Sequence, residues 1–533
     1  MVSSGNMPDA LQDRRVIIRR RAWGILMLTL MAAAVTFAAA QVSHVRLDMT
    51  EDGVYSLSDS TRSILSKLDE PVMVHAYITA DLPQPYGRLH RFIEDMLMSY
   101  HDAAGGKFGY NIVDPATDPN LAASLNALQI PKVRVQVVED DQAQVKQGYL
   151  AIVIEYLDRK ETIPVVQSEE GFEYLLTRKI KKLTGKGRAK IGVVSGFGAH
   201  GLQQMNRLQQ IAGDDYEFVD VAPDVSAIPD DVRALVVAGL REKPSENFRY
   251  RLDQFRMSGR GLFVLTGNAN PQLMRGFQVQ AVDPYANAWL ASDLGVVVDP
   301  GLVLDRRATR VVVNQQQGMI AMRSAVDYPF VIHAMQLDAT HPVSKGLESV
   351  TVPFASPVLW SEKVKGGKTL VSSSPASFVQ SGPPFDVDPL VSMRARFEGV
   401  SLRPSKLILA YEGEADSAFT TIPEGVKDGK HLAHTPHSRL LVAGAPAMLD
   451  DDFLDGSNSI FSLNALDWLA GDDALIALRS RGMSDRPLAD IDREARSAWK
   501  GLWMFGLPAL MVIAGLWRWW ILSRRSRHQL SNK

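Results

Sequence analysis

The sequence predicts an α/β fold with one transmembrane helix at each end. Short apolar runs alternate with amphipathic runs through most of the chain, as strands alternate with helices in α/β domains. Two long apolar segments, 22–41 and 501–522, lie near the ends, and arginines flank each on its terminal side. Gly185-Lys186-Gly187 interrupts the pattern, which predicts a boundary between a first α/β unit, 44–184, and a second α/β domain with a mostly parallel sheet, 185–472.

The arginines determine the predicted topology. Five of them precede the first apolar segment and three follow the second. Because Lys and Arg stay on the cytoplasmic side of membrane spans, the basic tails 1–21 and 523–533 are predicted to be cytoplasmic. The region between the spans is then periplasmic, and the protein is expected in the bacterial inner membrane with the lipid bilayer as a partner. The alternative for the first segment is a signal peptide cleaved after Ala38-Ala39-Ala40, but a length of about 19 residues favours an uncleaved anchor.

Composition excludes several classes of function. The formal net charge of -2 over 533 residues gives no reason to expect a nucleic-acid partner. The chain has no cysteine, which excludes disulfides, thiolate metal sites and a cysteine nucleophile. An exported domain without cysteine must be stabilised by its packed core, and it fits a bacterial envelope better than a disulfide-rich extracellular setting.

The first unit is predicted to contain four strands and three helices. Residues 71–79 are rich in β-branched side chains between prolines, which predicts a strand. Residues 88–103 place their apolar side chains on one helical face. Ser168, followed by two glutamates, is a predicted helix N-cap. The expected strands are 71–79, 107–113, 149–156 and 161–166, and the expected helices are 88–103, 120–128 and 168–183.

The second domain begins with a regular alternation of strands and helices. Its strands are almost continuously apolar, which is typical of a parallel sheet covered on both faces. Residues 300–400 mix short strands with turns, and the charged residues 473–500 form a predicted stalk. The expected strands are 189–195, 216–221, 233–238, 261–266, 296–298, 405–411 and 439–444, and the expected helices are 202–212, 245–257, 285–294 and 457–469.

The turn after the strand 189–195 is the candidate binding site. Residues 196–201, GFGAHG, fit the pattern G-x-G-x-x-G between a predicted strand and a predicted helix, with Asp220 further on. This is the context of a dinucleotide site, in which glycines let a pyrophosphate approach a helix N-terminus. The other interpretation is a structural turn in which glycines adopt positive φ. The predicted periplasmic location argues against a nucleotide ligand, because NAD and ATP are scarce outside the cytoplasm. We therefore predict no cofactor and name Gly196, Gly198, His200 and Gly201 as candidate ligand-binding residues.

No catalytic residue is predicted. Residues 366–369, GGKT, mimic the end of a phosphate-binding loop, but Glu362 stands where that motif needs glycine. Ser195 lies close to His200 in the chain, yet it does not occur in G-x-S-x-G. No base with an orienting acid can be assigned to it. The chain is therefore predicted not to be an enzyme.

No metal site is predicted either. The acidic run 450–452 has no calcium-loop spacing and is typical of a solvated loop. His431, His434 and His437 cluster in a loop near a proline, but no carboxylate follows in a ligand-like register.

The segment just after the first apolar region reads LDMTEDGVYSLS at residues 47–58 and continues through Leu68-Asp69-Glu70-Pro71-Val72 into a strand. It resembles the opening of the GldG family, auxiliary subunits of ABC-type export systems. Shorter similar stretches follow at 234–239, 294–296, 303–305, 341–343, 439–444 and 464–471.

The resemblance implies an inner-membrane protein whose periplasmic region holds an amidotransferase-like α/β domain. It implies an ABC ATPase and a multi-spanning permease as partners, and a substrate, an envelope polymer or a protein as ligand of the periplasmic region. The family often has an acid after the glycine turn, where this chain has Leu202. True amidotransferases use a cysteine nucleophile, so the fold would be used without that chemistry. The predicted function is a non-catalytic transport subunit. The alternatives are a membrane-tethered hydrolase using Ser195, His200 or the Asp450 region, and a purely structural tether.

Overall fold

The structure is a computed structural model that describes residues 55–479 with short gaps and a few positions nearer the ends. The gaps are 81, 84–85, 118, 128–129, 140–141, 186, 224–226, 273–276, 318–319, 427–429, 455, 473–475 and 477. The end positions are 23, 27, 29, 31, 499, 500, 504, 506, 511–517 and 519. The chain divides into two compact units after Met483. The basic tails and most of the predicted stalk lie outside the described residues.

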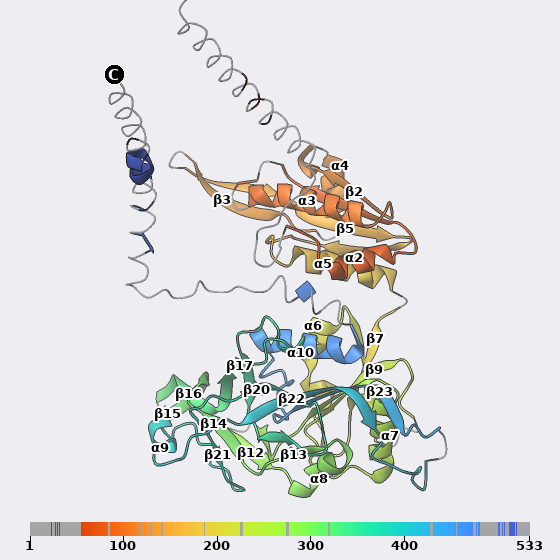
Figure 1. The fold of residues 1–533 in the computed structure, drawn as a ribbon, viewed down its shortest axis with the longest axis vertical. Helices are drawn as coiled ribbons and strands as arrows, with labels where there is room; N and C mark the ends of the chain where they lie inside the picture. Colours follow the sequence, from red (N-terminus) through yellow and green to blue (C-terminus); the bar gives the residue numbers. More distant parts are fainter. Residues whose placement is uncertain are drawn as a thin grey trace, which may run out of the picture. The chain divides into compact units, whose positions relative to one another are not determined.

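The prediction of one transmembrane helix at each end is corrected. Within the part of the chain that the structure describes, no helix has both the length and the apolar character needed to cross a membrane. The predicted spans 22–41 and 501–522 lie largely outside the described residues, and the longest described piece of either is the helical stretch 511–517. The architecture shown by the described residues is a mixed α/β fold (Figure 1).

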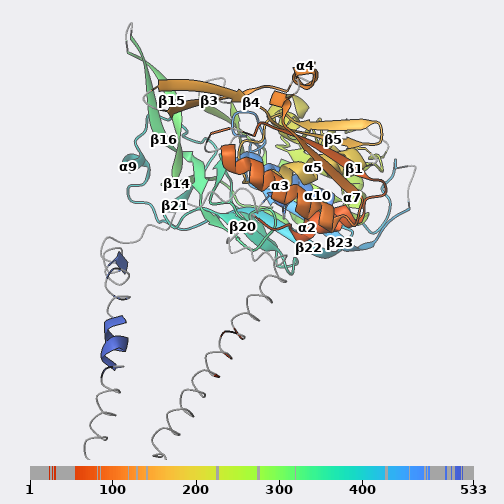
Figure 2. The same cartoon turned by 90° about the horizontal axis from the view of Figure 1, so that it is seen from above.

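The first sheet has four strands in the order β2-β1-β5-β6. Strands β1 and β2 are parallel, and the other pairs are antiparallel. Three helices, α2, α3 and α5, lie beside this sheet (Figure 2). They contribute apolar side chains to the core that packs on it. The strands are β1 (Val72–Ile78), β2 (Phe108–Val113), β5 (Leu150–Tyr156) and β6 (Arg159–Ile163), with a separate hairpin of β3 (Val133–Glu139) and β4 (Gln142–Gly148). The helices are α2 (Asp59–Ser66), α3 (Tyr86–Ala103), η1 (Pro115–Thr117), α4 (Pro119–Ala127) and α5 (Phe172–Thr184).

Helix α5 starts later than the sequence predicts. Gly171 precedes it with a left-handed φ of 74°, so the predicted N-cap at Ser168 is wrong. The Ser168 hydroxyl instead donates to the carbonyl of Glu170 at 2.9 Å.

The second sheet has eight strands in the order β17-β20-β22-β23-β10-β9-β7-β8. The five from β23 to β8 are parallel, and the remaining three pair antiparallel. In chain order the parallel strands lie 2-1-3-4-5, the arrangement of a doubly wound sheet. The strands are β7 (Ala189–Val194), β8 (Tyr216–Val221), β9 (Val232–Ala238), β10 (Gly261–Leu265), β17 (Gln336–Leu337), β20 (Lys368–Ser372), β22 (Lys406–Asp416) and β23 (His434–Ala443).

Helices cover both faces of this sheet, as the apolar strands predict. On one face α6 and α10 pack around Phe461 and Trp468. On the other, α7 and α8 pack around Phe248 and Trp289. Figure 1 shows α6 and α10 on one side of the sheet and α7 and α8 on the other. The predicted helix 202–212 is broken at Met205 into η2 and α6. The helices are η2 (Leu202–Gln204), α6 (Asn206–Ala212), α7 (Glu246–Met257), α8 (Pro284–Asp293), α9 (Met393–Arg396) and α10 (Gly456–Ala470).

Four small sheets occupy the region between β10 and β22. The largest contains a long hairpin of β15 and β16, where the sequence predicts only short strands. The strands are β11 (Ala269–Gln272), β12 (Gln278–Ala281), β13 (Val296–Val298), β14 (Leu302–Asp305), β15 (Ala308–Gln317), β16 (Ile320–Ala334), β18 (Val350–Pro353), β19 (Val358–Trp360) and β21 (Ser377–Gln380).

Candidate functional site

The topology marks one position on the second sheet as the place where a ligand would be expected. Parallel strand order reverses between β7 and β9, and open α/β sheets bind ligands outside the carboxyl ends of the strands at such a point. The turn 195–201 follows β7, and the turn 239–241 follows β9. The predicted binding residues therefore lie at the expected edge of the sheet.

The glycines of the turn after β7 make room for the protein's own side chains. Gly196 and Gly198 have φ of 88° and 70°. A Cβ at Gly196 would lie 2.2 Å from Cγ of Pro223, and one at Gly198 would lie 2.9 Å from Cβ of Arg241. The backbone N–H of Arg241 donates to the carbonyl of Phe197 at 2.9 Å. Close packing of three loops thus requires glycine here, with or without a ligand.

His200 is buried at the switch point, and protein groups engage both of its ring nitrogens. Nδ1 lies 2.8 Å from Oδ2 of Asp450, and Nε2 lies 2.6 Å from Oδ1 of Asn270. The ring also packs over Gly239, where a Cβ would be 2.6 Å from Cδ2. Burial raises the pKa of Asp450, while the hydrogen bond from His200 opposes that shift. His200 and Asn270 are buried and Asp450 is partly exposed, and hydrogen bonds join the three side chains beside the turn after β9.

Ser195 does not join this trio. Its hydroxyl donates to Oδ2 of Asp220 at 2.9 Å. The N–H of Gly201 donates to Oε1 of Gln204 at 2.9 Å, at the start of η2. The structure therefore brings Gly196, Gly198, His200 and Gly201 into one turn, but it pairs Ser195 with an acid and His200 with a different acid.

The acidic and histidine clusters seen in the sequence are dispersed among separate contacts. Asp450 binds His200, whereas Oδ1 of Asp451 accepts from the N–H of Arg207 at 2.7 Å. His434 lies 2.8 Å from Asp416. Among the residues with a described placement, no group of three His, Asp or Glu side chains could hold a metal ion.

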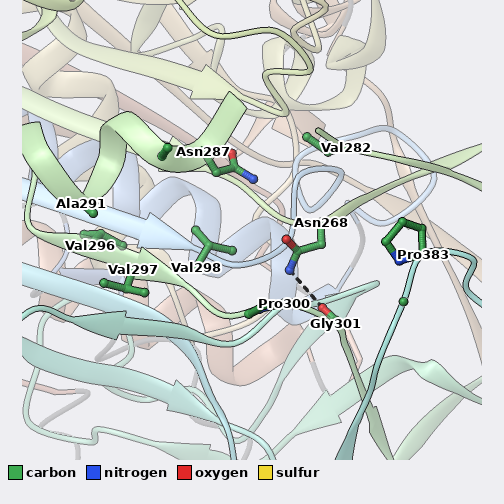
Figure 3. A pocket seen from close by; sticks show the side chains of 12 residues that line it. Asn268, Val282, Asn287, Ala291, Val296, Val297, Val298, Pro300, Gly301 and Pro383 are labelled. Carbon is green, nitrogen blue, oxygen red and sulfur yellow. Dashed lines mark hydrogen bonds between the residues drawn. The ribbon is translucent and has the colours of Figure 1, made fainter. Parts of the chain in front are cut away.

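A small pocket lies beside the carboxyl end of β10, and no sequence pattern predicted it (Figure 3). It measures about 170 Å³ and is lined largely by apolar side chains, with Asn268 and Asn287 as its amides. Both amides serve the fold, because Nδ2 of Asn268 donates to the carbonyl of Asp299 at 2.6 Å and Asn287 accepts from Thr266 at 2.7 Å. Organic ligands usually occupy pockets of about 300 Å³ or more, so this one favours water over an organic ligand.

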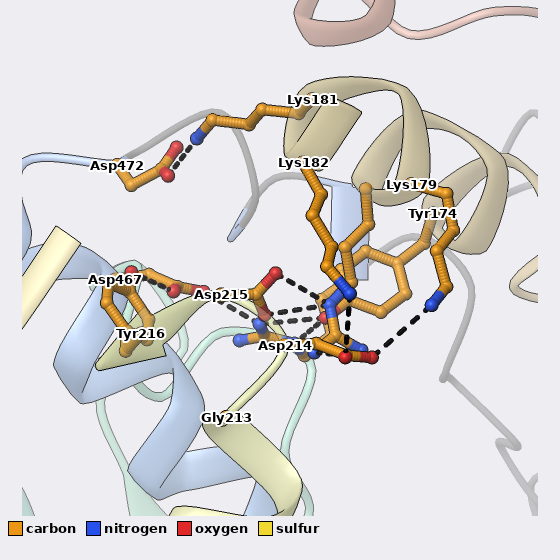
Figure 4. Close-up of polar contacts among 12 residues, drawn as sticks. Tyr174, Lys179, Lys181, Lys182, Gly213, Asp214, Asp215, Tyr216, Asp467 and Asp472 are labelled. Carbon is orange, nitrogen blue, oxygen red and sulfur yellow. Dashed lines mark hydrogen bonds and ion pairs between the residues drawn. The ribbon is translucent and has the colours of Figure 1, made fainter. Parts of the chain in front are cut away.

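Helix α5 contacts the second sheet through a polar cluster that sequence reasoning missed (Figure 4). Arg178 binds Asp215 at 2.7 Å, and Lys182 reaches Asp214 at 3.0 Å. Lys181 pairs with Asp472. The cationic face of α5 is therefore an interface between the two sheets rather than a solvated surface.

A fully buried ion pair lies behind that interface. Nη2 of Arg479 lies 2.7 Å from Oδ2 of Asp467, and both side chains are inaccessible to solvent. Arg479 also donates to the hydroxyl of Tyr174 on α5, at 2.9 Å from Nη2. The hydroxyl of Tyr216 donates to Oδ1 of Asp467 at 2.6 Å. Their spacing along the chain carries no signal that could have predicted this group.

Together, the fold and the site define an open, doubly wound α/β protein whose switch-point crevice is packed by its own side chains. The chain belongs to the ABC_transp_aux family, described as an ABC-type uncharacterized transport system, whose model matches residues 188–473. A domain of unknown function, DUF7088, matches residues 51–155. The family confirms the coarser part of the resemblance, an auxiliary component of an ABC transport system.

The individual proteins to which this chain is similar do not indicate a function for it. An uncharacterized protein of Borreliella burgdorferi is 22% identical over 517 residues, which cover 92% of this chain and 96% of that protein. Among solved structures, the N-terminal domain of mmIFT52 is 15% identical with a TM-score of 0.33, covering 52% of this chain and 97% of that one. A ThuA-like protein from Parabacteroides merdae is 13% identical with a TM-score of 0.26, covering 53% and 90%.

Proposed function

We propose that this chain is a non-catalytic auxiliary subunit of a bacterial ABC transport complex, of the gliding-motility-associated GldG type. Its partners would be an ABC ATPase and a multi-spanning permease, and its main region would act by binding. The observation that carries the proposal is the engagement of His200. Both ring nitrogens are within 2.8 Å of Asp450 or Asn270, so neither is free to take a proton from a nucleophile.

The position of Ser195 supports the same view. A serine nucleophile needs its hydroxyl hydrogen-bonded to the base, and here the hydroxyl is bonded to Asp220 instead. The glycine turn that suggests a ligand is contacted by Pro223 and Arg241, so it serves packing. Binding of an envelope polymer or a protein would then use other surfaces of the domain.

The location of the main region on the periplasmic side of the inner membrane is part of the proposal. The clusters of arginine near both ends of the sequence motivate it. Protease added to intact spheroplasts should cut a tagged copy of residues 55–479 only if the region faces outward. Full protection, with cutting only after lysis, would contradict the proposed location.

Isolation of the intact complex tests the proposed partners. The tagged full-length chain should co-purify in mild detergent with one ABC ATPase and one multi-spanning protein. A matched preparation from cells that lack the ATPase should lose the ATPase and keep the permease contact. Purification of the chain without either partner would contradict the proposed role.

One observation favours the alternative of a hydrolase. His200 and Asp450 have the geometry of a catalytic base with its orienting acid. The variant Ser195→Ala removes the candidate nucleophile and leaves this pair unchanged, and Ser66→Ala, at an exposed serine of α2, is a matched control. We expect both variants to support transport equally. Loss of transport in Ser195→Ala alone, with the complex intact, would favour the hydrolase.

A further inference from the structure

A pocket of about 530 Å³ lies away from the glycine turn, beside the last turn of α7. Arg256 of that turn lines it, together with Trp360 at the end of β19 and Tyr411 of β22. Lys363 and Lys365 line it from the loop after β19. The volume is within the range of small-molecule sites, unlike that of the pocket beside β10.

Arg256 is a buried cation without a direct counterion in the described structure. The residue is 6% exposed. The one hydrogen bond of its guanidinium within the described residues is a long one, from Nη2 to the carbonyl of Asp416 at 3.5 Å, and its buried Nε has no described partner. Burial lowers the pKa of Arg256. A buried charge without a partner is costly, which explains why such groups are normally paired.

The acids around Arg256 are committed to other groups. Asp293 is held by Arg249, with Nε 2.6 Å from Oδ2. Asp253 accepts from the hydroxyl of Ser417 at 2.6 Å and from a backbone N–H. Asp416 lies 2.8 Å from His434. Asp253 and Asp293 act on Arg256 through their charge at longer range, but neither neutralises the guanidinium by contact.

The rest of the lining adds cations and two aromatic rings. Lys363 and Lys365 are exposed at the opening, and Glu414, also exposed, is the lining acid without an ion pair in the described residues. The rings of Trp360 and Tyr411 meet edge to face, with centroids 6.2 Å apart. Three cations and three acids thus line the pocket beside two aromatic rings. Asp293 is paired with Arg249, whereas Asp416 contacts the imidazole of His434, so the buried Arg256 rather than the net charge of the lining favours an anion.

We propose that this pocket binds an anionic group, a carboxylate or a phosphate. Arg256 is its direct partner through the planar guanidinium, which suits both groups. Lys363 and Lys365 attract the anion to the opening, and the rings of Trp360 and Tyr411 contact an apolar part of the ligand. The anion can belong to a small molecule or to the end of a larger chain, which share this chemistry.

Binding of simple anions to the full chain tests the proposal. The probes are inorganic phosphate, acetate and benzoate, titrated by calorimetry against a chloride control at equal ionic strength. We expect saturable binding of phosphate and tighter binding of benzoate than of acetate, because only benzoate has a ring to place against the aromatic wall. Absence of saturable binding for all three probes would overturn the proposal. Equal affinities for benzoate and acetate would refute the role of the two rings.

Two variants locate the site. Arg256→Met should weaken benzoate binding by at least about tenfold, because a hydrogen bond to a charged group is lost. It should fold at least as well as the natural chain, since it removes a buried unpaired charge. The double variant Lys363→Ala with Lys365→Ala changes only exposed side chains and should weaken binding no more than about fivefold. Unchanged affinity in Arg256→Met would overturn the assignment, and if that variant does not fold, unchanged affinity in Arg256→Gln, which also removes the charge, would do so.

An acidic peptide distinguishes the two sources of the anion. A peptide whose C-terminal residue is phenylalanine carries a carboxylate beside an aromatic ring, and its C-terminal amide lacks the charge. Tighter binding of the acid than of benzoate indicates the end of a larger chain, whereas weaker binding indicates a small molecule. Equal binding of the peptide acid and its amide would contradict recognition of an anion.

Discussion

Gly196 and Gly366 have nearly the same backbone conformation in different surroundings. Their φ angles are 88° and 86°. A Cβ at Gly366 would meet no atom within 4 Å, whereas one at Gly196 would lie 2.2 Å from Cγ of Pro223. The pair therefore separates the cost of a left-handed backbone from the cost of a close contact.

We expect Gly196→Ala to be clearly more destabilising than Gly366→Ala. Both variants place a side chain on a left-handed backbone, which costs about 1–2 kcal/mol. Gly196→Ala also forces Pro223 to move, and overpacking adds about 1–3 kcal/mol. Urea unfolding of both variants measures the difference. Equal urea midpoints for the two variants would show that the turn at Gly196 can accept a Cβ without a clash with Pro223.

The same turn shows how far the sequence predicts the site. The strand and the glycines are local features, and the sequence places them correctly, whereas the predicted helix 202–212 is broken at Met205. Asn270 and Asp450, which hold His200, lie 70 and 250 residues further along the chain. No local pattern connects these positions, because only the sheet brings them together. The sequence could therefore name the turn but could not show that protein groups occupy its histidine.

Helix α5 illustrates what amphipathic patterning leaves undetermined. Its apolar face, with Leu176 and Ile180, packs on the first sheet as the pattern predicts. A cationic helix face is usually exposed to solvent. In α5, however, Arg178 contacts Asp215, and the two side chains are only 15% and 9% exposed. The pattern identifies which face is polar without identifying whether water or another element covers it.

Arg178→Ala should weaken the contact between α5 and the second sheet. It leaves Asp215 mostly buried without its partner, which should cost about 2–3 kcal/mol. Lys160→Ala is a control, because the Lys160–Glu155 pair is largely exposed and lies on β5 and β6, so no measurable loss is expected. Urea unfolding measures both variants, and trypsin cutting near residues 185–188 should accelerate in Arg178→Ala alone. Equal stability of the two variants would mean that α5 is held by its apolar face alone.

Strand prediction succeeded for short strands of the parallel sheet. The expected strand 216–221 coincides with β8, and 189–195 exceeds β7 by one residue. The hairpin of β15 and β16 was missed, because its polar run Gln315-Gln316-Gln317 lacks the apolar signal of a core strand. A hairpin is also specified by pairing between its two strands, which one-strand patterns do not contain.

Two buried groups act on the stability of the whole molecule in opposite directions as pH changes. Burial lowers the pKa of His341 to about 4, and the charge of nearby Lys368 lowers it further against Asp338 and Glu412. Burial raises the pKa of Asp467 to about 6, although Arg479 and Tyr216 favour its ionised form. The neighbouring ring of Trp468, whose centroid is 5.0 Å from that of His341, joins the two groups in one core.

The sign of each contribution follows from proton binding. Unfolded His341 binds a proton below pH of about 6.5, and the folded residue does not until about 4, so its contribution to stability grows as pH rises through this window. Folded Asp467 keeps a proton up to about 6, and the unfolded residue loses it near 3.8, so its contribution shrinks as pH rises through that range. Between pH 4 and 6 the two contributions oppose each other.

Two variants should separate these opposing slopes. The free energy of unfolding of the natural chain minus that of His341→Leu should rise by about 2 kcal/mol from pH 4 to 6.5, which allows for screening by solvent. The corresponding difference for Asp467→Asn should fall over pH 4 to 6, on top of a constant loss because Arg479 becomes an unpaired buried cation. Urea unfolding at several pH values measures both differences. If the first difference does not change with pH, His341 titrates normally in the folded protein. If the difference for Asp467→Asn rises with pH instead, Asp467 is ionised in the folded protein over the whole range from pH 4 to 6. The ion pair with Arg479 then outweighs the cost of burying the carboxylate.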